Sequence, residues 1–172
     1  MKITDHLIKK FGFNDLSITV VDVGARQANL DNWMNLGKKL HYYGFEPDEI
    51  ECAKLNIRAQ NAMWGGKEIY YPFALFSDKG KHKFYVTKNP GCSSLYKPNL
   101  KVTNFLELEE KISINKIVEL KTQTLDYWSQ TNNINPIDYI KIDVQGAELD
   151  VLKGGHSQIS NPGDRPSMST AP

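Results

Sequence analysis

One short segment constrains the fold more than any other: residues 138–155 read DYIKIDVQGAELDVLKGG. The stretch YIKIDV is β-prone with a single basic residue, and Asp143 lies near its end. Gly146 permits a tight turn, after which apolar and charged residues follow with helical spacing as far as a glycine pair. Open α/β sheets bind ligands at the carboxyl ends of such strands. The segment therefore predicts one edge of a ligand cleft, with Asp143 in it.

A second strand with an acidic ending lies near the start of the chain. Residues 17–23 (SITVVDV) are apolar and β-branched, and they lead through Asp22 to Gly24. Further along, HYYGF is strand-like, Glu46 follows it, and Pro47 begins a helix. This segment has the order of a βαβ unit: a strand, a glycine turn, a helix, a second strand and an acid. In such a unit the acid binds the hydroxyls of a ribose. We therefore expect these acids and Asp143 to surround one ligand.

Composition narrows the classes of protein. The 172 residues are 40% hydrophobic and 24% charged, which suits one globular domain. The net charge is only +1 and the basic clusters are scattered, so nucleic acid is not an expected partner. No apolar stretch approaches the roughly 20 residues that span a bilayer, and no secretory signal is recognisable, so a cytoplasmic location is expected. Cys52 and Cys92 are expected to be free thiols, and the histidines show no metal-ligand spacing.

Strands and helices are expected to alternate along the rest of the chain. Helices are predicted at residues 4–10, 30–40 and 47–63, and further strands at residues 69–76, 83–87 and 116–122. Ile50, Ala53 and Ile57 are expected to face the core from the helix at residues 47–63. Pro72 interrupts the strand predicted at residues 69–76. The alternation predicts an α/β fold with a mostly parallel sheet covered by helices on both faces.

The last residues differ from the rest in composition. Residues 157–172 carry three prolines and four serines and almost no large apolar side chain, so disorder is expected there. The predicted organisation is one domain at residues 1–156 followed by this tail. A complete doubly wound sheet needs further strands after the Asp143 unit, and we expect these last strands to be missing.

Six motifs together resemble the FkbM family of S-adenosylmethionine-dependent methyltransferases. They are VVDVGA, YGFEPD, ALFSDKG, GCSSL, TLDYW and IKIDVQGAELDVLKGG, they occur in the order that the family shows, and they cover residues 18–155. The last motif is the most specific. The resemblance implies a Rossmann-like class I methyltransferase fold, truncated at its C-terminus, with S-adenosylmethionine as cofactor and a hydroxyl of a small molecule or sugar as acceptor.

The resemblance also implies roles for individual residues. The implied cofactor site consists of Asp22, Gly24, Ala25, Glu46, Pro47, Ser77, Asp78 and Asp143. In that family pattern Asp22 and Gly24 would line the methionine end, Glu46 would bind the ribose hydroxyls, and Ser77 with Asp78 would border the adenine. Asp143 would lie beside the sulfonium and the substrate, and Ser93 and Ser94 resemble an acceptor-side loop.

Three departures from the family pattern leave an alternative open. Arg26 and Ala28 stand where the family has a small or amide residue and a glycine, and Gln145 replaces the glutamate of DVEGAE. The third departure is the C-terminal portion, which in the family adds strands and part of the acceptor pocket. The alternative is therefore an inactive or truncated cofactor-binding remnant.

The residues alone favour a cationic cofactor over a dinucleotide. The close approach of a pyrophosphate needs a second glycine after the strand, and Arg26 or Gln27 occupies that position. A dehydrogenase is therefore the less favoured enzyme. S-adenosylmethionine has no phosphate, and carboxylates such as Asp22 and Asp143 suit its sulfonium and amino group.

If the acceptor is a hydroxyl, a base assists in removing its proton. Asp143 is the first candidate for this catalytic base and His156 the second. Each candidate also has a structural reading: Asp143 as a cap of the Gly146 turn, Glu46 as a helix N-terminal acid, and the serine loop as a simple turn. Arg26 pairs either with the cofactor carboxylate or with Asp31.

Overall fold

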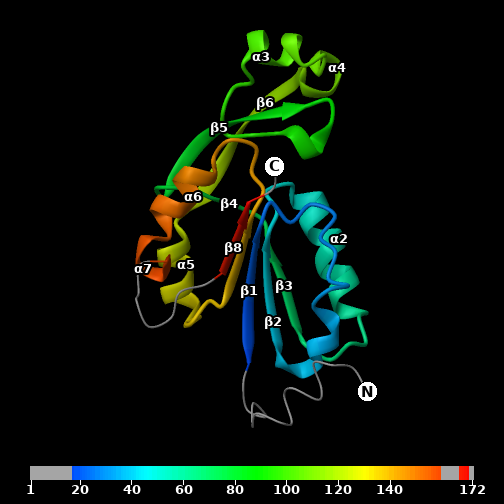
Figure 1. The fold of residues 1–172 in the computed structure, drawn as a ribbon, viewed down its shortest axis with the longest axis vertical. Coiled ribbons are helices and arrows are strands. Elements are labelled where there is room, and N and C mark those ends of the chain that lie inside the picture. Colours follow the sequence, from blue (N-terminus) through cyan, green and yellow to red (C-terminus); the bar gives the residue numbers. More distant parts are fainter. Residues whose placement is uncertain (1–16, 160–166, 171–172) are drawn as a thin grey trace.

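A computed structural model describes residues 17–159 and 167–170, and its main element is a parallel sheet of five strands (Figure 1). The strands lie in the order β3–β2–β1–β7–β8, with bounds Lys67–Tyr71, Leu40–Phe45, Ile18–Val23, Tyr139–Ile142 and Ser167–Thr170. Val23 pairs with Phe45 on one side and with Ile142 on the other, so the carboxyl ends of three strands are level. We call this sheet A.

Helices cover both faces of sheet A. On one face α2 (Glu49–Gln60) contributes Cys52 and Leu55 to a cluster with Val20 and Tyr42. On the other face α5 (Leu125–Asn132) and α6 (Glu148–Gly154) pack Trp128 and other apolar side chains against the sheet. Strand β1 contributes to both clusters, because successive residues of a strand point to opposite faces: Val20 lies in the first cluster and Val21 in the second. The predicted α/β fold, a mostly parallel sheet flanked by helices, is confirmed.

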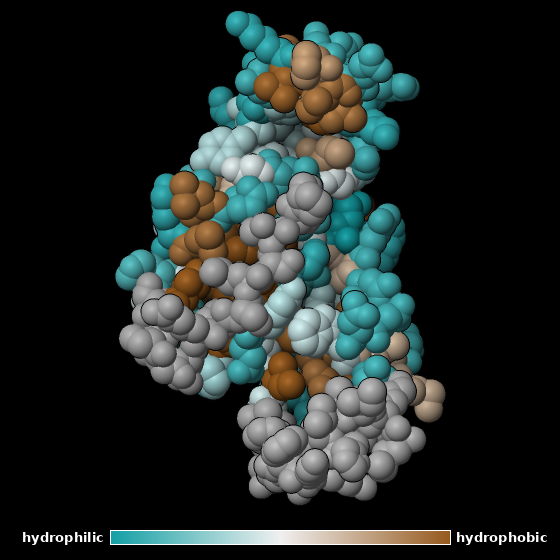
Figure 2. Space-filling model, viewed as in Figure 1, coloured by the Kyte–Doolittle hydropathy of each residue, from teal (hydrophilic) through white to brown (hydrophobic). Residues whose placement is uncertain are grey.

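A smaller sheet, sheet B, stands beyond the carboxyl ends of sheet A (Figure 1). It contains β4 (Ala74–Leu75), β6 (Ile114–Gln123) and β5 (Gly80–Thr87) in that order, with β5 antiparallel to β6. The connection between β5 and β6 carries η3 (Pro90–Cys92), α3 (Leu100–Phe105) and α4 (Glu109–Ile112). Figure 2 shows apolar side chains on the surface of this end of the molecule, where Phe105 is 85% exposed.

The helix expected after the first glycine turn does not form. Residues 26–33 form turns and irregular backbone, and only a 3-10 segment, η2 (Met34–Lys39), precedes β2. Gly37 has a φ of 55° inside that segment, a left-handed conformation that breaks helical continuity. The connection from β1 to β2 is therefore largely irregular. The strand expected at residues 69–76 is likewise divided into β3 and β4 around Pro72.

The predicted inward face of α2 is wrong. Ile50 and Ile57 are 71% and 59% exposed, whereas Cys52 and Leu55 are buried. The helix begins at Glu49 because Asp48 caps it, accepting hydrogen bonds from the amides of Ile50 and Glu51. This starting point sets which residues meet sheet A.

Two segments of the tail expected after residue 156 have regular secondary structure. Helix α7 (His156–Ile159) is held by Asp126, whose carboxylate accepts from the amides of Ser157 and Gln158 at 3.0 and 3.2 Å. Strand β8 pairs in parallel with β7, so sheet A has a strand that the sequence was expected to lack. The other residues of the predicted tail, 160–166 and 171–172, and the first helix expected at residues 4–10 lie outside the described residues.

Candidate functional site

A pocket of about 1030 Å³ lies between the carboxyl ends of sheet A and one side of sheet B. Its walls come from the ends of β1, β2 and β7, from the start of α2, and from β5, β6 and η3. Sheet A changes its direction of winding between β1 and β7, and ligands of open parallel sheets bind at such a point. The volume is at the upper end of the range for small-molecule sites.

Gly24 brings the turn after β1 close to β7. Its φ is +84°, and a Cβ atom at this position would lie 2.0 Å from the carbonyl oxygen of Asp143. The amides of Gly24 and Ala25 both donate to the carbonyl oxygen of Phe45, at 3.1 and 3.0 Å. Only glycine fits this contact, so the turn is a structural requirement as well as part of the pocket wall. Ala25 is fully buried and does not line the pocket.

Glu46 lies at the end of β2 with its side chain 5% exposed, and it lines the pocket with Pro47. Its Oε1 accepts from the amide of Asp48 at 2.9 Å, and a guanidinium nitrogen of Arg26 lies 3.7 Å away. Burial raises the pKa of the Glu46 carboxyl, while the Asp48 amide and Arg26 oppose that rise. Arg26 donates to Asp48 at 2.6 Å, a partner that is neither of the two alternatives expected for it, the cofactor carboxylate and Asp31.

Asp143 is half-buried at the end of β7 and lines the same pocket. Its amide donates to the carbonyl oxygen of Val23 at 2.8 Å, and its Oδ1 accepts from the side-chain amide of Gln145, also at 2.8 Å. The amide of Gly146 in the following turn donates to Glu148 at 3.0 Å. The turn is thus capped by Glu148, and Asp143 lines the pocket beside the glycine turn of β1.

Asp22 lies elsewhere. It is 3% exposed and belongs to the middle of sheet A, where its carboxylate accepts from the Tyr42 hydroxyl and from the Lys141 ammonium, the latter at 2.9 Å. Burial raises the pKa of Asp22, and Lys141 and Tyr42 oppose the rise. The structure therefore brings Glu46 and Asp143 together in the pocket and places Asp22 outside it, contrary to the expected group of three acids.

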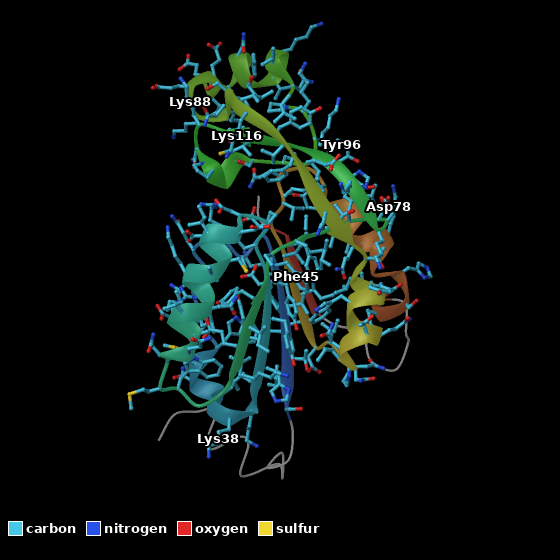
Figure 3. All side chains as sticks on the ribbon, turned by 180° about the vertical axis from the view of Figure 1, so that it is seen from behind. Lys38, Phe45, Asp78, Lys88, Tyr96 and Lys116 are labelled. Carbon is cyan, nitrogen blue, oxygen red and sulfur yellow. The ribbon has the colours of Figure 1, made fainter. Side chains whose placement is uncertain are left out.

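Ser77 and Asp78 also lie outside the pocket. The Asp78 carboxylate lies 3.2 Å from Nε2 of His82, and Figure 3 shows Asp78 at the opposite end of the β5–β6 ribbon from Lys88. The backbone at residues 76–77 packs on α6, where a Cβ atom at Gly154 would lie 2.1 Å from the carbonyl oxygen of Phe76. The structure therefore does not bring this pair together with Glu46 and Asp143 in the pocket.

The two serines of the GCSSL motif have different surroundings. Ser93 lines the pocket, and its hydroxyl accepts from the amide of Thr87 at 3.1 Å. Ser94 is 5% exposed and donates to the carbonyl oxygen of Gln145 at 2.8 Å while it accepts from the amide of Tyr96 at 3.0 Å. Ser94 thus ties this loop to the turn that carries Asp143, whereas Ser93 is available to a ligand.

Sequence reasoning missed the contribution of sheet B. The large apolar residues of this sheet that line the pocket are Leu75, Phe84, Val86, Val118 and Leu120, and Lys88 and Lys116 line it as well. The alternation of apolar and polar residues in both strands was the available signal. Within the described residues no group of three or more histidine, cysteine or acidic side chains is arranged to hold a metal ion. Among the same residues no helix is both long and apolar enough to cross a membrane.

The fold and the site define a class of protein. It is an α/β protein whose pocket lies where the strand order of the parallel sheet reverses. The family model named methyltransferase FkbM domain matches residues 22–169. The chain therefore belongs to the FkbM methyltransferase family, which confirms the resemblance seen in its motifs.

A curated relative is a 2-O-methyltransferase, NoeI, of Sinorhizobium fredii (strain NBRC 101917 / NGR234), to which the chain is 24% identical over 149 residues. The match covers 82% of this chain and 58% of the relative. The chain thus spans less than two thirds of the relative's length. No solved structure is significantly similar.

Proposed function

We propose that this chain is the S-adenosylmethionine-dependent portion of an O-methyltransferase with a Rossmann-like class I fold, acting on a hydroxyl of a small molecule or sugar. The observation that carries the proposal is the meeting of the Gly24 turn, Glu46 and Asp143 in one pocket at the end of sheet A. The name of the relative, a 2-O-methyltransferase, supports oxygen as the methylated atom. Cys52 and Cys92 are free thiols, which suits the reducing cytoplasm.

The residues present fit the cofactor. Glu46 is a nearly buried carboxylate at the end of the second strand, the place from which an acid binds ribose hydroxyls. Gly24 and Asp143 would hold the methionine end, where a carboxylate suits the positive charge of the sulfonium and ammonium groups. The guanidinium of Arg26 is paired with Asp48, and Arg26 lines the pocket. A dinucleotide site has a glycine at this position, so that the backbone can approach the pyrophosphate. This arrangement disfavours the dinucleotide of a dehydrogenase.

S-adenosylmethionine supplies an electrophilic methyl group when it is bound. The protein's own part is to position the acceptor hydroxyl in line with that group and to receive its proton. Asp143, which lines the pocket, would accept the proton, and Gln145 would orient its carboxylate through the 2.8 Å hydrogen bond to Oδ1. Ser93, whose hydroxyl lies in the wall across from sheet A, would contact the acceptor.

Titration calorimetry with S-adenosylmethionine, S-adenosylhomocysteine and NAD tests the cofactor assignment. We expect binding of the first two and none of NAD. Binding of NAD alone would replace the methyltransferase with a nucleotide-dependent enzyme.

A methyl-transfer assay with a panel of hydroxyl acceptors tests the enzyme assignment. Because the chain covers 58% of its relative, a cofactor-binding portion without turnover is the competing reading. Binding of S-adenosylhomocysteine together with no methyl transfer to any acceptor would favour that reading.

A further inference from the structure

Sheet B presents an apolar surface to the pocket. Phe84 and Val86 of β5 alternate along the strand, as do Val118 and Leu120 of β6, so each pair faces the same side. Phe84 pairs directly with Val118 across the ribbon. All four side chains are only half-buried. They form the wall that faces the acids of sheet A.

The same side of the ribbon ends in two lysines. Lys116 is the partner of Val86 in the strand register, and Lys88 comes two residues after Val86, beyond the irregularity at Thr87, where it also lines the pocket. Both side chains are exposed and both line the pocket (Figure 3). None of the ion pairs between residues of the described segments includes either lysine, whereas Lys81 at the other end of β5 is paired with Glu119. Two ammonium groups are therefore left facing the pocket.

The pocket is thus polarised along its length. At the sheet A end Glu46 and Asp143 are acidic, and Arg26 is neutralised by Asp48 at 2.6 Å. At the sheet B end the charged side chains of the wall are Lys88 and Lys116. A cationic ligand is favoured at the first end and an anionic ligand at the second, and the apolar surface separates the two.

We propose that the sheet B side of the pocket is the acceptor subsite, and that it selects an acceptor carrying an apolar ring or chain and an anionic group, a carboxylate or a phosphate. The apolar part lies on Phe84, Val86, Val118 and Leu120, and the anion binds Lys88 and Lys116 through charge-assisted hydrogen bonds. The inference rests on the proposed methyltransferase function, since it names the substrate class of the same pocket.

Three matched probes test the subsite: 4-nitrophenyl β-D-glucoside, which is neutral, the corresponding glucuronide, and the glucoside 6-phosphate. All three carry the same apolar ring and several hydroxyls. Calorimetry is done with and without S-adenosylhomocysteine. At least one anionic probe is expected to bind about tenfold to a hundredfold more tightly than the glucoside, the range of a charge-assisted hydrogen bond. The comparison between the glucuronide and the phosphate shows which anion is preferred.

The double variant Lys88→Gln/Lys116→Gln is expected to remove that preference and leave the affinity for the neutral glucoside unchanged. The matched control is Lys83→Gln, an exposed lysine of β5 that faces away from the pocket. Substitutions at such exposed positions alter stability by about 0.5 kcal/mol or less, so folding is retained. An anion preference that persists in the double variant, or equal loss in the control, overturns the proposal.

Failure of the subsite and failure of the proposed function are distinguishable. If S-adenosylhomocysteine binds and neither anionic probe binds better than the glucoside, the acceptor subsite is wrong and the cofactor assignment stands. If S-adenosylhomocysteine does not bind, the cofactor assignment is wrong. In that case, anion binding that depends on Lys88 and Lys116 still supports an anionic ligand for sheet B. If no such anion binding is found, the subsite is overturned as well.

Discussion

The side-chain amide of Gln145 donates a hydrogen bond to Oδ1 of Asp143 at 2.8 Å, and the carbonyl oxygen of Gln145 accepts one from Ser94. Gln145 has a φ of 57°, so its backbone is left-handed, and this conformation brings its side chain back toward Asp143. One residue therefore couples the candidate base to the GCSSL loop. An ionised glutamate, the residue of the family pattern, has no N–H group with which to donate this hydrogen bond.

We predict that Gln145→Leu lowers the rate constant of methyl transfer by about tenfold or more, because it removes the hydrogen bond that orients the Asp143 carboxylate. The affinity for S-adenosylhomocysteine should change little. Single-turnover kinetics measure the rate constant and calorimetry measures the affinity. An unchanged rate constant would show that Gln145 does not position Asp143 for proton transfer.

Glu46 offers a test that needs no acceptor. Glu46→Ala should weaken the binding of S-adenosylhomocysteine by about 1 to 3 kcal/mol, because it removes a charge-assisted hydrogen bond to the ribose. Calorimetry measures the change. The matched control is Glu119→Ala, an exposed glutamate of β6 outside the pocket, which should leave the affinity unaltered. Equal affinity in Glu46→Ala and the unaltered chain would remove Glu46 from the cofactor site.

The sequence predicts those site residues whose position follows from where a parallel strand ends. Glu46 and Asp143 each come directly after the last residue of a strand, and Gly24 follows β1. Parallel pairing alone therefore brings them to one edge of the sheet. Asp22 is different because β1 continues to Val23, so Asp22 is inside the strand and its side chain lies over the α2 face among Tyr42 and Lys141. An acid before the last strand residue is not a strand-end acid.

The residues that sequence analysis misses depend on contacts between distant segments. The pocket side of sheet B is defined by the β5–β6 register, which pairs Phe84 with Val118 across the long connection that carries α3 and α4. No local pattern gives that register. The inward face of α2 depends in the same way on where Asp48 starts the helix, and a shift of one residue rotates the helix by about 100°.

A comparison of Gly24 with Gly146 separates the cost of backbone strain from the cost of a close contact. Gly24 and Gly146 both have positive φ, +84° and +101°, but a Cβ atom meets the Asp143 carbonyl oxygen at 2.0 Å in the first and nothing within 4 Å in the second. Gly146→Ala should cost about 1 to 2 kcal/mol of unfolding free energy from backbone strain alone. Gly24→Ala should cost clearly more, because β1 and β7 must also move apart. Chemical denaturation measures both, and equal losses would contradict the close contact.

The buried Asp22–Lys141 pair gives a stability prediction with a definite pH dependence. Burial raises the pKa of the Asp22 carboxyl above its ordinary value and Lys141 opposes the rise, so the ammonium chiefly stabilises the ionised form. Lys141→Met should lower the unfolding free energy near neutral pH by about 1 to 2 kcal/mol, the lower part of the penalty for an unsatisfied buried group, since the Lys141 side chain is 39% exposed.

The sign of the pH dependence follows from the same shift. A carboxyl with a raised pKa in the folded state binds its proton more tightly when folded, so acidification stabilises the folded state through this group as the pH falls through that pKa. Lys141→Met raises the pKa of Asp22 further, and a protonated Asp22 needs no cation. Denaturant titrations at a series of pH values should therefore show that the deficit relative to the unaltered chain shrinks as the pH falls from neutrality through the raised pKa of Asp22. Lys54→Met, which removes an exposed lysine 3.5 Å from Glu51, should show a small and nearly constant change. A deficit in Lys141→Met that stays constant over this range would mean that Asp22 is not the group that Lys141 stabilises.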